Sequence, residues 1–316
     1  MHRVRLLLGV VMLACAGWVL AQPSAEALEK ARTVPIADVH MHTYAFQGPP
    51  AQAFLEQMDK NGVAWGGAVG DYRSDVAELL GQRYIAALGQ REFTRVYRSQ
   101  GQAGLIDPQH PVFVAFFDEA ERLFAQGQAK GFGELHTDNH QSGPRNFHRQ
   151  IRTDNPVMRR FFEMASKHGG FVQIHSQRSD DFLADILKLT ADYPQVLTIL
   201  SHCLPLSRPD DLAALFKQRA NLVCELSAQG YVHNKLAGLS RPPRVHSDQG
   251  IGPGWMRLIE AYPDRIMIGT DACCGWFDAY SEMVQELRTH FLPYLAPDLM
   301  EQLAYKNAVR LLKLAP

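Results

Sequence analysis

The amino-acid sequence predicts an α/β fold, a single-domain (β/α)₈ TIM barrel, over residues 35–316. Short apolar runs alternate with longer segments of helical period, which is typical of a parallel sheet. Eight such units fit a chain of this length, and ligand-type residues stand at the C-terminal ends of many runs, as in barrels. An open, doubly wound sheet, the alternative, would concentrate its site at one switch point. The predicted strands are Ile36–His42, Val63–Val69, Val112–Phe117, Phe132–Leu135, Phe171–His175, Val196–His202, Leu222–Leu226 and Ile266–Thr270.

The segments between these runs have the features of helices. Pro156–His168 begins with proline at a first-turn position, carries apolar residues at helical spacing and ends at Gly169-Gly170. The long connection from Gly70 to Pro111 is expected to hold extra helices. Two polar loops, His136–Asn155 and Gln229–Pro253, are expected over the active-site face. The other predicted helices are Ala51–Asn61, Asp180–Ala191, Pro209–Arg219, Gly254–Tyr262, Asp278–His290 and Pro297–Leu314.

Residues 1–21 have the pattern of an export signal, and residues 22–34 that of a linker with helical leanings. Arg3 and Arg5 precede the nearly continuous apolar stretch Leu6–Leu20, and Val19-Leu20-Ala21 is a candidate cleavage site. A stretch of about 15 apolar residues is short for a membrane span. We therefore expect an exported, periplasmic protein with no stable membrane span in the mature chain. A retained N-terminal anchor and a lipoprotein tether at Cys15 are the alternatives.

The charge balance limits the class of partner. Lys and Arg number 32 against 33 Asp and Glu, so the chain has no basic excess with which to bind nucleic acid. A small-molecule substrate is expected instead, and a homo-oligomer is compatible with the sequence. Hydrophobic residues make up 46% of the chain, which is enough for a sizeable core.

The cysteines do not form a recognisable disulfide framework. Cys203 and Cys224 end apolar runs, where buried thiols are expected. Cys273 and Cys274 are adjacent, and a bridge between neighbours needs strained geometry. We expect few or no structural disulfides, although export usually favours them.

The first predicted strand carries a chelating pair. His40 and His42 are separated by one residue, so their imidazoles share one face of the strand and point into the mouth of the barrel. Imidazole is the commonest transition-metal ligand in proteins. A His-x-His pair alone is a weak signal, because two half-exposed strand histidines would look the same.

Four more predicted strands end in His or a carboxylate. The predicted strands bring all these polar groups to one rim of the barrel, where burying them without partners would cost free energy. A metal ion bound there would satisfy them together. Each residue alone has a structural explanation, such as a helix cap for Gly269-Thr270-Asp271. The four groups are Glu134, His175, His202 and Asp271.

This order of residues resembles the amidohydrolase superfamily. The segment Tyr305–Leu312 is similar to the closing helix of its amidohydrolase-2 branch, where an Asn-Ala-x-Arg element ends the barrel. The resemblance covers roughly residues 36–314 and implies a (β/α)₈ metal-dependent enzyme. The residues that carry it are Asp38-x-His40-x-His42, Glu134, His175, His202 and Gly269-Thr270-Asp271.

The resemblance also implies roles for these residues. His40, His42, His175 and Asp271 match the ligands of a first divalent ion, expected to be zinc. Asp271 also matches the general base, and His202 matches either a second-metal ligand or a group that polarises the substrate. Asp38 is expected to hold a histidine tautomer by a hydrogen bond from behind the ligands.

Glu134 departs from many two-metal members, which carry a carbamylated lysine at the end of the fourth strand. Lys130 lies at the wrong end of that strand. The run Gly133-Glu134-Leu135 resembles TatD-like deoxyribonucleases, in which this glutamate binds metal, and it also occurs in one-metal amidohydrolase-2 members. The sequence therefore leaves open one or two ions, with Glu134 as a ligand or as a neighbouring carboxylate.

Several other polar residues are candidates for the substrate site. Arg73, Arg145 and Arg178 follow predicted strands, and each could bind a substrate carboxylate through its guanidinium. His136 could face the mouth of the barrel. His233 and His246 lie on a predicted loop, and Trp276 lies beyond Asp271; these three could shape specificity or line a lid.

A metal-dependent hydrolase is the function that these features favour. Metal-activated water, with Asp271 as general base, would cleave a small ester, lactone, amide or phosphoester. The alternative within the superfamily is a decarboxylase or hydratase acting on a small carboxylate. A barrel that binds a ligand without turnover and a TatD-like nuclease are the remaining alternatives.

Overall fold

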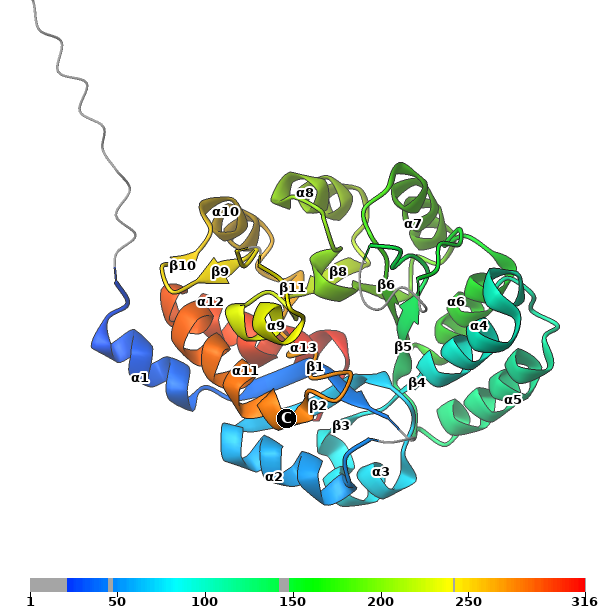
Figure 1. The fold of residues 1–316 in the computed structure, drawn as a ribbon, viewed down its shortest axis with the longest axis horizontal. Coiled ribbons are helices and arrows are strands. Elements are labelled where there is room, and N and C mark those ends of the chain that lie inside the picture. The colour runs from blue at the N-terminus through cyan, green and yellow to red at the C-terminus, as the bar shows by residue number, and fades with distance from the viewer. Residues whose placement is uncertain (1–21, 45–47, 142–147, 241, 316) are drawn as a thin grey trace, which may run out of the picture.

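The computed structural model describes residues 22–44, 48–141, 148–240 and 242–315. Parallel strands lie at the centre and helices surround them (Figure 1). One sheet has the order β1-β2-β3 and another the order β11-β8-β7-β6-β5-β4. The strands are β1 Ile36–Thr43, β2 Val63–Gly70, β3 Tyr84–Ile85, β4 Ala87–Gly89, β5 Gly131–His136, β6 Phe171–His175, β7 Leu197–Leu200, β8 Leu222–Glu225 and β11 Ile266–Met267, with a small antiparallel pair, β9 His246–Ser247 and β10 Gly250–Ile251.

The two large sheets meet at both edges, but continuous strand pairing does not close them into a barrel. Only Ala86 separates β3 from β4, so one chain segment serves both sheets. At the other edge, the backbone N–H of Val39 donates to the carbonyl of Ile268, and that of Asp271 donates to His40. The predicted α/β fold with parallel strands is confirmed, whereas strand pairing around a full barrel is not seen.

The helices follow the strands in the predicted alternation. Ala51–Asn61 and Pro156–His168 have their predicted bounds. Asn155 caps the latter by accepting the N–H groups of Val157 and Met158, and Gly169 ends it with φ +67°. The helices are α1 Ala25–Thr33, α2 Ala51–Asn61, α3 Ser74–Leu80, α4 Gln90–Gly104, α5 Pro111–Ala125, α6 Pro156–His168, α7 Asp180–Asp192, α8 Pro209–Gln218, α9 Tyr231–Leu236, α10 Pro253–Ala261, α11 Tyr280–Glu286, α12 Pro297–Glu301 and α13 Asn307–Leu311.

The predicted strand Val112–Phe117 is wrong, because this segment lies within α5. Pro111 occupies the first turn, and the ring of His110 accepts the backbone N–H of Val112 as a cap. The buried Phe113, Phe116, Phe117 and Ala120 recur at helical spacing. The third strand position is instead filled by Tyr84–Gly89, inside the predicted long connection, which also holds the expected extra helices α3 and α4.

The N-terminal helix α1 is tied to the rest of the fold by Arg288. This guanidinium is buried and donates to the carbonyls of Ala31 at 2.6 Å, Val34 at 3.0 Å and Asn61 at 2.9 Å. The predicted helical leaning of residues 22–34 is therefore realised as α1. Residues 1–21, including Cys15, lie outside the described residues. None of the helices in the described part of the chain is both long and apolar enough to cross a membrane.

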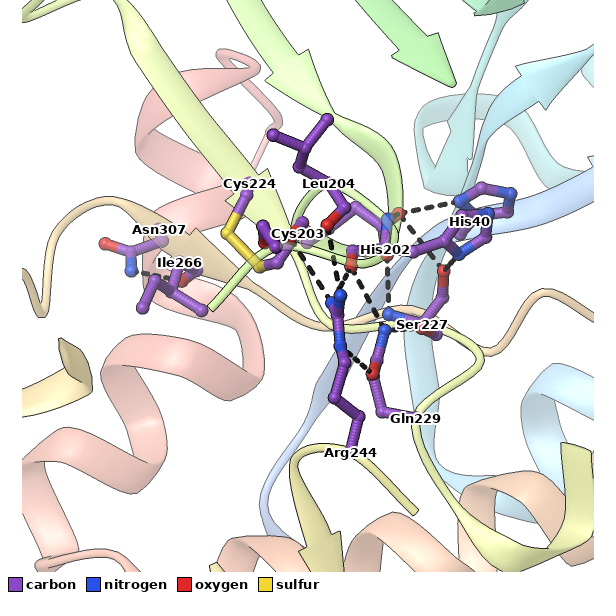
Figure 2. The surroundings of a disulfide bond; sticks show 12 residues. His40, His202, Cys203, Leu204, Cys224, Ser227, Gln229, Arg244, Ile266 and Asn307 are labelled. Carbon is purple, nitrogen blue, oxygen red and sulfur yellow. Dashed lines mark hydrogen bonds and ion pairs between the residues drawn. A yellow bond between two sulfur atoms is a disulfide. The ribbon is translucent and has the colours of Figure 1, made fainter. Parts of the chain in front are cut away.

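The C-terminal Asn-Ala-x-Arg element fixes the last strand of the sheet. The amide of Asn307 donates to the carbonyl of Ile266 at 2.7 Å (Figure 2) and to that of Pro263 at 2.7 Å. Arg310 donates to the carbonyl of Asp264 at 2.8 Å. These hydrogen bonds satisfy the backbone at the start of β11. They position the strand that leads to Asp271.

The expectation of free, buried thiols at Cys203 and Cys224 is wrong. The two residues form a disulfide, and their Cα atoms are 4.8 Å apart (Figure 2). Cys224 lies in β8 and Cys203 directly follows the adjacent strand β7, so parallel pairing brings both side chains together. Cys273 and Cys274 are free.

Candidate metal centre

The strands bring the predicted ligand residues to one end of the sheets. All six are buried, although they come from five separate segments of the chain. They are His40 and His42 in β1, Glu134 in β5, His175 at the end of β6, His202 after β7, and Asp271 after β11.

The imidazole of His40 is the innermost group of the cluster. Its Nε2 lies 3.6 Å from Oε2 of Glu134 and 3.6 Å from Oδ1 of Asp271, and it has no hydrogen-bond partner among the described residues. Its Nδ1 lies 2.8 Å from Oε1 of Glu225. The ring is fully buried, so Nε2 faces two carboxylates and no water-exposed surface.

Four imidazoles surround the carboxylate of Glu134. Oε1 lies 2.8 Å from Nδ1 of His175 and 3.2 Å from Nε2 of His202. Oε2 lies 3.6 Å from His40 and 3.3 Å from Nε2 of His136. The candidate His136 therefore belongs to this cluster, where its ring stacks on that of His175.

Asp271 forms the opposite side of the cluster. Its Oδ1 lies 3.1 Å from Nε2 of His42, and its Oδ2 lies 3.6 Å from His233 and 4.0 Å from His202. The Nδ1 of His42 in turn contacts Oε1 of Gln90 at 3.1 Å. This contact orients the His42 ring so that Nε2 faces Asp271.

His202 is held in an unusual backbone conformation. His202, Cys203 and Leu204 all have positive φ, at 55°, 45° and 56°, which non-glycine residues rarely adopt. Arg244 donates to the carbonyls of His202 at 2.5 Å and Leu204 at 3.0 Å, and the disulfide adds a covalent restraint (Figure 2). Such strain persists only where the surroundings over-determine it, as at functional sites.

Among the described residues Asp38 contacts no histidine ring, so the predicted hydrogen bond that would set a histidine tautomer is not found. Its Oδ1 accepts the backbone N–H groups of His40 and Thr270, each at 3.0 Å, and its Oδ2 accepts the Thr270 hydroxyl at 2.7 Å. Asp38 thus ties β1 to the segment that leads into Asp271. Glu225 holds the His40 ring instead.

The buried charges shift one another's pKa values. Burial raises the pKa of Glu134, but His136, His40 and His175 outweigh it and lower that pKa well below its usual value. His40, with His233 and His42, lowers the pKa of Asp271 in the same way against burial. Burial lowers the pKa of His40, but Glu225, Glu134 and Asp271 raise it well above the usual value. The carboxylates of Glu134 and Asp271 are therefore ionised and favour a positive charge at the centre of the cluster.

A family model extends over nearly all of this architecture. The amidohydrolase model of the Amidohydro_2 family matches residues 37–314. This chain belongs to the amidohydrolase-2 family. It is accordingly an enzyme of the amidohydrolase superfamily, whose members are metal-dependent. No curated protein sequence matches this amidohydrolase.

Three solved structures are similar to this chain at low sequence identity. An uncharacterized TIM-barrel protein from Bordetella bronchiseptica is 18% identical, with a TM-score of 0.48, over 82% of this chain and 81% of its own. A putative amidohydrolase from Staphylococcus aureus is 14% identical, with a TM-score of 0.48, over 89% and 100%. A probable 2-pyrone-4,6-dicarboxylic acid hydrolase from Acinetobacter baumannii is 11% identical, with a TM-score of 0.48, over 89% and 97%.

The residues of the amidohydrolase cluster fit a divalent ion. Ligand atoms of His40, His42 and Glu134 lie within 4.8 Å of one another, as do those of His40, His202 and Asp271. Two ligands about 2.1 Å from one ion at a tetrahedral angle are about 3.4 Å apart, close to the 3.6 Å that separates His40 Nε2 from each carboxylate. The Nε2 atoms of His40 and His175 are buried without hydrogen-bond partners among the described residues, as metal-free ligand atoms would be.

Sequence reasoning missed Glu225, although it carried a signal. The run Leu222–Leu226 is apolar apart from this carboxylate, and a charge inside a buried strand needs a partner. Glu225 meets that need by contacting His40 and by accepting the backbone N–H of His202 at 2.7 Å. Gln90 and Ser227, which contact His42 and Nδ1 of His202, were also missed, and their types gave no signal.

The arginines expected at the substrate site have protein partners. Arg73 donates to Asp75 and to the carbonyl of Pro49. Arg178, which is partly exposed, donates to Asp180. Arg145 lies outside the described residues.

The remaining candidates divide into two groups. His233 contacts Asp271, and the ring of Trp276 lies edge-on to His233 at 5.4 Å. Cys273 also approaches His42 and Asp271, within the same 4.8 Å limit. His246, by contrast, lies in β9, where its buried ring packs against Phe291.

Proposed function

We propose that this amidohydrolase is a metal-dependent hydrolase of a small ester, lactone, amide or phosphoester, with Asp271 as general base. The observation that carries the proposal is the fully buried Nε2 of His40, which faces Glu134 and Asp271 at 3.6 Å each and has no hydrogen-bond partner in the described part of the chain. Two ionised carboxylates and an imidazole nitrogen that converge on one point favour a metal ion there, which would displace the proton that the carboxylates otherwise hold on His40. Zinc suits such a mixture of imidazole and carboxylate ligands.

The side chains of the cluster have separable tasks in this proposal. His40, His42, His175 and Asp271 would hold the first ion, with Glu134 as a further ligand or bridge. A divalent ion bound there would polarise a substrate carbonyl or phosphoryl oxygen and lower the pKa of a bound water. Asp271 accepts the proton of the attacking water on a carboxylate oxygen. His202, held by Ser227 at 2.7 Å, presents Nε2 to the substrate oxygen or to a second ion.

A substrate screen with product analysis tests this function. Purified protein is assayed on esters, lactones, amides and phosphoesters, and in parallel on small carboxylic acids for loss of CO₂ or water. We expect addition of water across a scissile bond, abolished by a chelator and restored by zinc. Decarboxylation without hydrolysis would replace the hydrolase by the lyase of the same superfamily. Full activity in metal-free protein would reject both.

The number of ions is tested by elemental analysis. If Glu134 bridges two ions, Glu134→Gln reduces the metal content from about two equivalents to about one. If Glu134 only neighbours a single ion, both proteins carry about one equivalent. A wild-type protein without bound metal would reject the proposed centre.

We further propose that the strands form a (β/α)₈ barrel and that the protein is exported after cleavage near Gln22. The hydrogen bond from Val39 to Ile268 and the shared segment Tyr84–Gly89 support the barrel. The basic and apolar pattern of residues 1–21 supports export. N-terminal sequencing of protein from an exporting host would reject export if Met1 were retained in the cytoplasm.

A further inference from the structure

Arg149 is a buried arginine with unused hydrogen-bond donors. Only 4% of the residue is exposed, and its Nε and Nη1 have no partner among the described residues. Arg288 is buried to the same degree, at 3% exposed, but its guanidinium donates to the carbonyls of Ala31, Val34 and Asn61. A buried charge without such partners is costly, so the donors of Arg149 call for a ligand.

The backbone of Arg149 is fixed next to the metal centre. Its N–H donates to Oδ1 of Asn139 at 2.9 Å, and its carbonyl accepts the N–H of Asn139 at 3.1 Å. Asn139 lies three residues beyond His136, which contacts Glu134 at 3.3 Å. Arg149 therefore belongs to the loop that follows β5 at the end of the sheet where the cluster lies.

Aromatic side chains of α4 hold the guanidinium in place. Its carbon lies 4.6 Å from the centre of the Tyr97 ring and 6.0 Å from that of Phe93. The same helix begins with Gln90, which contacts His42. These contacts hold the guanidinium against α4 and leave Nε and Nη1 without a hydrogen-bond partner among the described residues.

Arg149 is charged at neutral pH. Burial lowers its pKa to about 10, while Tyr97 and Glu134 act in the opposite direction. No carboxylate of the described residues lies within 4.0 Å of it, in contrast to Arg73 and Arg178. The guanidinium is thus positively charged and forms no ion pair with a carboxylate in the described part of the chain.

We infer that Arg149 is the anion-binding residue of the substrate site and that the substrate carries a carboxylate. A planar carboxylate matches the edge of a guanidinium through two parallel N–H···O bonds. The inference rests on the proposed function, since it assigns a substrate class to that same site. Binding of a substrate carboxylate, which the sequence suggested for Arg73, Arg145 or Arg178, is thereby assigned to Arg149, a residue that the sequence did not single out.

The test compares a carboxylate with its neutral amide. Titration calorimetry measures binding of benzoate and benzamide, and of malonate, to metal-loaded wild type, Arg149→Gln, Arg149→Lys and Arg178→Gln. We expect Arg149→Gln to weaken benzoate or malonate binding roughly tenfold or more and to leave benzamide binding unchanged. Arg149→Lys keeps the positive charge but cannot form two parallel N–H···O bonds to one carboxylate. Its affinity for the acids should therefore lie between those of Arg149→Gln and wild type. Arg178→Gln serves as the matched control and binds like wild type.

Metal-stripped protein separates this inference from the proposed function. A carboxylate that binds only the ion loses affinity in all variants when the ion is removed, whereas binding through Arg149 keeps its dependence on Arg149. Equal affinity of wild type and folded Arg149→Gln for the carboxylates overturns the inference, as does a wild type that binds neither acid at millimolar concentration. If Arg149→Gln does not fold, Arg149→Lys decides in its place. Absence of metal from the wild type would instead reject the proposed function alone.

Discussion

The Nδ1 atom of His40 lies 2.8 Å from Oε1 of Glu225, and both side chains are fully buried. With the proton of a neutral ring on Nδ1, this contact leaves the Nε2 lone pair facing Glu134 and Asp271. The same carboxylate accepts the backbone N–H groups of His202 at 2.7 Å and Ser227 at 2.8 Å. Glu225 therefore couples the orientation of His40 to the position of His202.

Glu225→Gln should weaken metal binding without removing a ligand. Glutamine keeps the shape but turns one acceptor into a donor that faces backbone N–H groups. Loss of such a supporting partner typically lowers metal affinity by about 10–100-fold. Competition with a chelator of known affinity measures the change. Glu163→Gln, on the exposed pair with Arg160, is the control; equal affinity of Glu225→Gln and wild type would contradict the assigned role.

The strand that carries His40 was predictable because it satisfies two patterns at once. Its apolar residues mark a buried strand, and its histidines recur at the two-residue period that places them on one face. Val112–Phe117 shows the limit of the same reasoning. An apolar run of six residues fits a buried strand and a helix face equally well. Pro111, at the first helical turn, was the signal that would have decided for the helix.

The supporting contacts of the site depend on packing between distant segments, which one sequence does not reveal. Asp38 was expected to hydrogen-bond a histidine ring. The packing of β1 against the segment after β11 instead brings the backbone N–H groups of His40 and Thr270 to its carboxylate. Cys203 and Cys224 looked like separate buried thiols, because the register of β7 against β8 decides whether they meet. Arg149 lies in a polar loop, where burial was not expected.

Removal of the disulfide should destabilise the fold and loosen His202. The bridge closes a loop between residues 21 positions apart, for which the loss of stability is about 3 kcal/mol. Thermal unfolding of Cys203→Ala/Cys224→Ala should therefore occur several degrees below that of the wild type. A reducing agent should lower the wild-type Tm toward that of the double variant and leave the variant unchanged. A wild-type Tm insensitive to complete reduction would contradict this expectation.

His246 should make the fold sensitive to mild acid. Burial, with the nearby His290, lowers its pKa to about 4. The unfolded chain titrates near pH 6.5, so below that pH it takes up a proton that the folded ring refuses. The stability that the neutral ring supplies is complete above pH 6.5 and is lost as the pH falls toward about 4. The loss between pH 7 and pH 5 is about 2 kcal/mol.

Urea unfolding at several pH values checks this prediction. His246→Gln cannot titrate, so its free energy of unfolding should fall less steeply below pH 6.5 than that of wild type. Both proteins are measured with a chelator present, because the proposed ligands also gain protons in acid. The readout is the difference in slope, which does not depend on how far the substitution destabilises the fold at neutral pH. Parallel curves for the two proteins would rule out His246 as the source.

Asp271→Asn should separate the two tasks proposed for this residue. Asparagine keeps the shape and one oxygen donor toward His42 and His40, but it does not accept a proton near neutral pH. The variant should therefore retain much of its metal and lose turnover by about 10²–10⁴-fold, or about 3–5 kcal/mol of barrier. Metal content and kcat are measured side by side on a substrate found in the screen. The acid limb of the wild-type pH–rate profile should report Asp271 and the water together, as an apparent pKa of the coupled pair. A variant with normal metal and normal kcat would show that another group takes the proton, whereas loss of both would leave Asp271 as a ligand alone.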